Sequence, residues 1–265
     1  MVGNYLQKLY DSFVGVGLWA LLFIRSLWVT FKRPPSLTLV IDQMYQIGFL
    51  SLPVVTITGF STGLVLAAQA FYQLADKGLG STTGLLVGKS MLTEIGPVLT
   101  AFMVTGRVGS SMTAMLGSMR VTEQIDALRS MAVNPLRYLV APRVIACVLM
   151  LPLLTVFSAV IGIYGGYLIS VHIFGMTAQG YFDPMPANIT YFDFWMGVIK
   201  GFVFGFLIST ISCYKGMTTR GGAAGVGRAT TNSVVISYSY ILIINFMLTI
   251  GLNVLHKLYL QRFAT

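Results

Sequence analysis

Five long apolar stretches constrain this chain more than any other feature of its sequence. They cover residues 43–75, 84–106, 144–171, 194–214 and 230–256, and three of the five contain no charged residue. Each is long enough to cross a bilayer as a helix, which takes about 20 residues. Only 9% of the 265 residues are charged, against about 25% in soluble domains. The ten-residue alternation of a membrane β-barrel is absent from these stretches. The sequence therefore predicts an all-α integral membrane protein with five transmembrane helices in a single domain, residues 1–265.

A shorter apolar segment precedes the first of these spans. Residues 12–24 are too few to cross a bilayer, and the residues before them place apolar and polar side chains on opposite sides of a helix. We expect residues 4–31 to form an interfacial elbow helix. A cleaved signal peptide is the alternative. It is disfavoured because no small-residue cleavage site follows and Arg25 stands at the end of the run.

The distribution of Lys and Arg predicts the orientation of the chain. Twelve lie before the first span or in the loops that join spans 2 and 3 and spans 4 and 5. The opposite side has Lys77, Lys257 and Arg262. Cytoplasmic loops carry the excess of positive charge, so we expect a cytoplasmic N-terminus and an outward-facing C-terminus. The net charge of +9 is read as this orientation signal and not as a nucleic-acid site.

Small residues recur at four-residue spacing within several spans, as in Gly59/Gly63 and Gly162/Gly166. This spacing lets helix backbones approach closely. Most such pairs are expected to pack within the chain. Because five helices make a small bundle for a transport path, we expect other faces to pair with a second copy.

Two charges inside the spans stand out. Glu94 lies near the middle of span 2, and Lys200 is the only charge within span 4. A lone charge at this depth is costly, so the two are expected to pair. Pro97 removes the backbone hydrogen bond to the Thr93 carbonyl and loosens the turn beside Glu94. Two interpretations stay open: a bridge that only holds two helices together, or a group that lines the transport path or controls its opening.

The segment between spans 2 and 3 predicts a short amphipathic helix on the cytoplasmic side. We expect Thr122 to cap it, with Glu123 in its first turn, and Asn134-Pro135 to end it. Its apolar stripe is Val121, Ile125, Leu128 and Ala132, and its polar residues are Glu123, Gln124, Asp126 and Arg129. Two acids on the polar face favour a protein partner over the membrane surface. This is the form of a coupling helix that docks on a motor subunit.

Motifs for catalysis or nucleotide binding are missing from the sequence. Gly88-Lys89-Ser90 resembles the end of a phosphate-binding loop, but Thr83 stands where that loop needs glycine. His172, Asp183 and Asp193 do not match a metal-ligand spacing. Cys147 and Cys213 both lie in apolar stretches and are interpreted as core residues. We therefore expect neither an enzyme nor a bound cofactor or metal in this chain.

Several segments resemble the MlaE/YrbE family of lipid-transport permeases over about residues 40–255. The matching segments are Ser51-Leu52-Pro53-Val54-Val55 with Gly59, Gly63 and Gln69; Glu94-Ile95-Gly96-Pro97-Val98; Gly106-Arg107-Val108-Gly109-Ser110; Thr122-Glu123-Gln124-Ile125-Asp126-Ala127-Leu128; Pro135; Pro142-Arg143; and Arg228-Ala229-Thr230-Thr231. The segment beginning at Thr122 is the most specific of them.

The resemblance implies a homodimeric ABC-transporter permease of the bacterial inner membrane, with its C-terminus in the periplasm. The implied partners are a cytoplasmic ATPase that binds ATP and Mg, a periplasmic MCE-domain protein and a STAS-domain protein. The implied substrate is phospholipid, moved for outer-membrane lipid homeostasis. By family position, Leu66, Gln69, Ala70 and Leu74 would contact lipid, Glu94 and Lys200 match a charged pair, and Glu123, Gln124, Asp126, Leu128 and Arg129 would contact the ATPase. Thr93 departs from the family, where arginine is frequent at this position.

Two other functions remain open from the sequence. The chain could be a scaffold that only recruits the MCE protein, or a lipid channel that needs no energy. Both predict the absence of an ATPase partner, which separates them from an ATP-driven permease.

Overall fold

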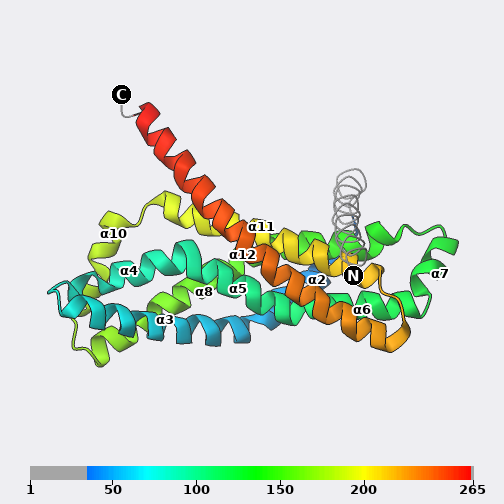
Figure 1. Ribbon diagram of the computed structural model, residues 1–265, viewed down its shortest axis with the longest axis horizontal. Helices are drawn as coiled ribbons and strands as arrows, with labels where there is room; N and C mark the ends of the chain where they lie inside the picture. The colour runs from blue at the N-terminus through cyan, green and yellow to red at the C-terminus, as the bar shows by residue number, and fades with distance from the viewer. Residues whose placement is uncertain (1–34, 264–265) are drawn as a thin grey trace, which may run out of the picture.

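The computed structural model describes residues 35–263 of the chain, and the elbow helix expected over residues 4–31 lies outside them. The described part is helical and contains no strand. Five of its helical segments are long and apolar enough to cross a membrane: Leu37–Ala75, Gly80–Val121, Leu136–His172, Tyr191–Met217 and Gly222–Tyr259. The prediction of an all-α membrane protein with five spans is thus confirmed. Figure 1 shows them as an elongated bundle, with the small helix α7 at one end and α10 at the other.

Most spans are built from more than one helical piece. The first contains α2 (Leu37–Ile47), the 3₁₀ turn η1 (Phe49–Ser51) and α3 (Leu52–Ala75). The second contains η2 (Gly80–Thr82), α4 (Thr83–Ser90), the π turn η3 (Met91–Ile95), α5 (Gly96–Val104), the π turn η4 (Thr105–Gly109) and α6 (Ser110–Val121). The third contains the π turn η5 (Leu136–Val140) and α8 (Ala141–His172), and α11 (Tyr191–Met217) and α12 (Gly222–Phe263) are the fourth and fifth. Between spans lie α7 (Gln124–Ser130), α9 (Ala178–Phe182) and α10 (Pro184–Asn188).

The second span extends well past the predicted range of 84–106. Residues 107–118, which the predicted ranges leave between spans 2 and 3, continue the helix through η4 and α6. The reason is lateral packing: Thr113 is fully buried and donates to the Ser212 carbonyl at 3.1 Å. Its hydroxyl also lies 3.0 Å from that of Ser233 on α12. Polar side chains are stable in this helix because neighbouring helices satisfy them.

Glycines set the closest helix crossings. A Cβ at Gly63 would lie 1.9 Å from the carbonyl oxygen of Gly162, so α3 and α8 touch through their backbones. Nearer the start of α8, Gly205 of α11 packs against the carbonyl of Cys147 in the same way. Span 3 is therefore held between spans 1 and 4, and it carries much of the buried core.

The fifth span is the least covered. Only 11% of the residues in its most apolar window are buried, and Figure 1 shows the C-terminal part of α12 standing away from the bundle. Phe192 at the start of α11 stacks on His256 of α12, with ring centroids 3.9 Å apart. The exposed apolar side chains of α12 include Leu242, Ile243, Phe246, Met247 and Val254. Much of this helix thus has no protein neighbour within the described chain.

Candidate functional site

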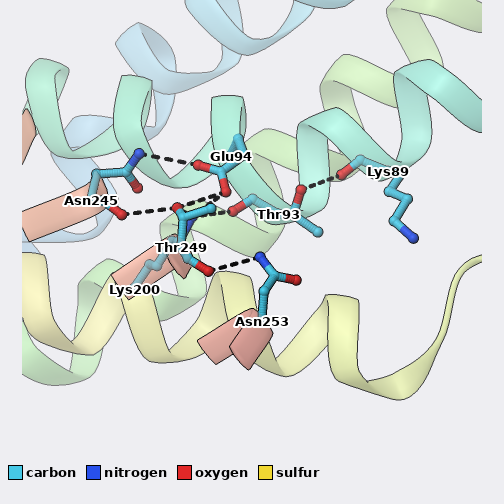
Figure 2. Close-up of polar contacts among 7 residues, drawn as sticks. All are labelled: Lys89, Thr93, Glu94, Lys200, Asn245, Thr249 and Asn253. Carbon is cyan, nitrogen blue, oxygen red and sulfur yellow. Dashed lines mark hydrogen bonds and ion pairs between the residues drawn. The ribbon is translucent and has the colours of Figure 1, made fainter. Parts of the chain in front are cut away.

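An ion pair lies between the second and fourth spans. The Lys200 ammonium is 2.6 Å from a carboxylate oxygen of Glu94. The Lys200 side chain is fully buried, whereas 35% of the Glu94 side chain is exposed. Figure 2 shows both groups meeting beside η3. The pair is therefore asymmetric: its cation is enclosed in protein and its anion borders open space.

The same ammonium also satisfies the backbone at the proline-loosened turn. Pro97 has no N–H, so the Thr93 carbonyl lacks its usual helical donor. Lys200 donates to that carbonyl at 2.9 Å. The chain is locally widened into the π turn η3, which begins at Met91 and ends at Ile95. Such π turns are frequent at functional sites. The lysine thus binds a side chain and a freed backbone group together.

The fifth span completes the cluster with two residues that the sequence analysis missed. The hydroxyl of Thr249 accepts from Lys200 at 2.9 Å and lies 2.9 Å from Glu94 Oε1. The amide of Asn245 donates to Glu94 Oε2 at 3.1 Å. A signal was present, because Asn245, Thr249 and Asn253 recur every four residues in an otherwise apolar span and so share one helix face.

This arrangement links three spans through charge. All three ammonium protons of Lys200 have acceptors: Glu94, the Thr93 carbonyl and Thr249. On the anion side, α12 contributes neutral donors only, and the buried Oδ1 of Asn245 has no hydrogen-bond partner. The contacts of α12 to the cluster are therefore weaker than those of α11.

Lys89 belongs to a different ion pair, which lies nearer the end of the bundle opposite α7. It lies 3.5 Å from Asp193 and its side chain is 52% exposed, and Figure 2 shows it pointing away from Glu94. Asp193 also accepts from the backbone N–H of Thr190, in a capping box that begins α11. Asp193 therefore serves as a helix cap and a counter-charge. Within residues 35–263, groups of three or more His, Cys, Asp or Glu that could hold a metal are absent.

The four predicted lipid contacts on α3 have different surroundings. Leu74 lines an open groove of ≈330 Å³ together with Leu85, Leu86 and Lys89. Leu66 is half-buried against the apolar cluster of α3, α4 and α8, and Gln69 is exposed. Ala70 is only 5% exposed within the single chain. The groove thus combines apolar walls with one cation, which suits a lipid and its headgroup.

The helix between spans 2 and 3 forms, but its start differs from the prediction. Thr122 does not cap it, because its hydroxyl donates to the Ser118 carbonyl of the preceding helix. Glu123 begins the turn instead, with φ +60° in the left-handed region. This sharp reversal is needed because α6 runs directly into α7 after a two-residue turn.

The apolar stripe of α7 is shorter than predicted. Ile125 is 1% exposed and Leu128 packs beside it on the cluster of Leu139, Val140 and Val144. Val121 and Ala132 are exposed because they lie outside α7, Val121 as the last residue of α6 and Ala132 in the turn after α7. The polar residues Glu123, Gln124, Asp126 and Arg129 face outward. Asp126 pairs with Arg120 at 2.6 Å and Arg129 at 3.0 Å. The helix α7 is thus anchored by its apolar side, and its exposed side carries both acidic and basic side chains.

Comparisons with known proteins agree with this architecture. A family model described as "Permease MlaE" matches residues 40–251. A probable ABC transporter permease protein of Rickettsia typhi is 40% identical over 249 residues, covering 94% of this chain and 95% of the relative. The intermembrane phospholipid transport system permease protein MlaE of Haemophilus influenzae is 35% identical over 212 residues, covering 80% and 81%. The chloroplastic protein TRIGALACTOSYLDIACYLGLYCEROL 1 of Arabidopsis thaliana is 37% identical over 209 residues, which are 79% of this chain and 60% of that protein. A family match over most of the chain, five membrane-length helices and relatives above 30% identity together show that this chain belongs to the MlaE family of ABC transporter permeases.

Proposed function

We propose that this chain works as a homodimer that moves phospholipid between the inner membrane and a periplasmic MCE-domain carrier. ATP hydrolysis by a separate cytoplasmic ATPase drives the movement, and that subunit binds ATP and Mg. Family membership supports the permease role, and the name of the Haemophilus influenzae relative supports phospholipid as the substrate. A STAS-domain protein is a further expected partner.

The observation that carries this proposal is the asymmetric charge cluster at the edge of α12. Glu94 is a third exposed, beside a helix whose apolar side chains are largely uncovered. A second copy packed against this face would enclose a space with apolar walls and one polar group. Such a space suits a molecule with acyl chains and a charged headgroup. The groove with Leu74 and Lys89 lies between the first and second spans, further from α7 than Glu94.

The position of α7 supports a separate motor. Its outward side carries Glu123, Asp126 and Arg129, while Ile125 and Leu128 tie it to the ends of spans 2, 3 and 4. A partner that pushed on α7 would therefore transmit force into the bundle. The distribution of Lys and Arg supports a cytoplasmic location for this helix and a periplasmic C-terminus.

Reconstitution tests the function directly. The permease, its ATPase and the MCE protein are placed in proteoliposomes, and transfer of a fluorescent phospholipid between membrane and carrier is measured with ATP and with a non-hydrolysable analogue. We expect transfer only with hydrolysis. Equal transfer under both conditions would support an energy-independent channel, and binding of the MCE protein without transfer would support a scaffold.

Photo-crosslinking tests the lipid contacts. A photoreactive residue at Leu66 or Leu74 is expected to capture phospholipid in the active complex. The control is Val160, which is 56% exposed on α8. It lies within about one and a half helical turns of the depth of Leu66, because Gly63 packs against Gly162. Equal capture at all three positions would mean bulk bilayer contact and would contradict a specific pocket.

A further inference from the structure

A second polar cavity lies where α2, η4, α6 and the start of α8 meet. Its volume of ≈390 Å³ is within the usual range for small-ligand sites. Arg107, which lines it, is 13 residues beyond Glu94, or roughly 20 Å along the second span toward α7. The cavity is therefore separate from the Glu94–Lys200 cluster and from the groove beside Leu74.

Arg143 is the unusual member of this cavity. Arg143 is only 6% exposed, yet it has no carboxylate partner among residues 35–263. The guanidinium donates to the Leu139 carbonyl at 2.7 Å and to the sulfur of Met115 at 2.9 Å. A thioether is a weak acceptor. A buried charge left with one good acceptor is costly, so the fold brings this arginine to the cavity at an energetic cost.

Arg107 brings a second positive charge to the same space. It donates to the Gln46 carbonyl at 3.1 Å and to the Ser51 hydroxyl at 2.7 Å. Both contacts use Nη1, and the other guanidinium nitrogens of Arg107 form no further hydrogen bond with residues 35–263. These donors remain available to a ligand in the cavity that Arg107 lines. Like Arg143, it lacks an ion pair within the described chain. Two arginines thus converge on one cavity without an acidic side chain between them.

The remaining lining indicates what kind of anion fits. Gln43 and Ser111 add neutral polar groups, while Leu50, Val108 and Met112 add apolar wall. Guanidinium groups match the oxygens of phosphate with paired hydrogen bonds. We propose that this cavity binds a phosphate group, with Arg107 and Arg143 as its cationic ligands. That phosphate is carried by a phospholipid headgroup or by a free phosphate, and the site does not depend on the transport function proposed above.

Binding to the purified full-length protein in detergent tests the proposal. The probes are dihexanoyl phosphatidylglycerol, inorganic phosphate and dihexanoylglycerol, which lacks phosphate, and the readout is the midpoint of thermal unfolding against probe concentration. We expect saturable binding of a phosphate-bearing probe and none of dihexanoylglycerol. Arg107→Gln and Arg143→Gln should each weaken it at least about tenfold, the loss expected for one charged hydrogen bond. Binding of phosphatidylglycerol alone assigns a lipid headgroup, and comparable binding of inorganic phosphate assigns a free phosphate.

Three further variants keep the result decisive. Arg220→Gln removes an equally charged but exposed side chain and should leave binding unchanged, which also separates site binding from general stabilisation by salt. Leu66→Trp obstructs the proposed transport pocket and should leave the arginine-dependent binding intact. Arg143→Lys keeps the charge if Arg143→Gln fails to fold, and should retain part of the binding.

Two outcomes would overturn the proposal. Phosphate binding that is the same in the wild type and in Arg107→Gln would place the anion elsewhere. Asp11 is the only acidic residue in positions 1–34. Binding seen only after Asp11→Asn would show that a carboxylate of the chain itself occupies the two arginines.

Discussion

Neutralising Glu94 and Lys200, singly and together, tests how the charge cluster is held. In Glu94→Gln the Lys200 ammonium stays fully buried and keeps only neutral acceptors, the Thr93 carbonyl and Thr249. Breaking a buried pair from one side costs about 3–5 kcal/mol. In Lys200→Met the remaining carboxylate is a third exposed and keeps Thr249 and Asn245. Its loss of a counter-charge is therefore expected to cost less.

Lys200→Met has a second cost that does not depend on charge. It removes the side-chain donor to the Thr93 carbonyl, and Pro97 has no N–H to replace it. An unsatisfied buried carbonyl costs about 1–3 kcal/mol. The double mutant removes both charges but keeps this cost. We expect it to be about 1–3 kcal/mol less stable than the wild type and about 2 kcal/mol more stable than Glu94→Gln.

Adding Pro97→Ala to the double mutant isolates the cost of leaving the Thr93 carbonyl without a donor. Alanine restores an N–H that the helix can direct to the Thr93 carbonyl, so the triple mutant should recover most of the remaining loss. The free energy of unfolding is measured by SDS titration in mixed micelles for every variant. Phospholipid transfer is recorded in parallel, since the triple mutant should transfer lipid normally if the charge pair has only a structural role.

Two results would refute this reasoning. A double mutant no more stable than Glu94→Gln would show that the two charges are not energetically coupled. If Pro97→Ala stabilised the wild type as much as the double mutant, the Thr93 carbonyl would not be the source of the residual loss.

The remaining predictions concern packing and the partner. Gly63→Ala should lower the unfolding free energy by about 1–3 kcal/mol or more, because its Cβ would lie 1.9 Å from a carbonyl oxygen of α8; Gly227→Ala, which meets open space, is the control and should not lower it. Ile125→Ala should cost about 2–5 kcal/mol and speed hydrogen exchange in α7, since this side chain is its buried anchor; unchanged exchange would contradict that role. Glu123→Lys with Asp126→Lys should abolish co-purification of the ATPase but change stability little, because exposed ion pairs contribute about 0–1 kcal/mol. Full recovery of the ATPase with this variant would exclude α7 as its docking site.

The number of spans could be predicted from sequence because the bilayer sets the length of each apolar run. The ends of the spans could not. Residues 107–118 have the composition of a loop, yet they continue the second span because α11 and α12 satisfy Thr113. Hydropathy identifies the residues of a span that contact lipid. It does not identify residues 107–118, because this part of the helix contacts protein.

Local chemistry was predictable where a covalent rule applied. The ring of Pro97 removes an N–H whatever the fold, so a free carbonyl at Thr93 follows from sequence alone. Which group takes up that carbonyl depends on how α11 is rotated against η3, and this is a property of the packed bundle. The same holds for Asn245 and Thr249, whose spacing indicates a shared face but not what it faces.

Arg107 and Arg143 show how burial changes the meaning of a charge. In the sequence both count toward the positive-inside signal, which treats every arginine beside a span as solvated. In the fold Arg143 is enclosed beside Leu139 and Met115, and Arg107 is fixed to the first span. A solvated arginine needs no partner, whereas an enclosed one needs an anion. The proposed phosphate site therefore follows from where the helices place these two side chains and not from their presence in the sequence.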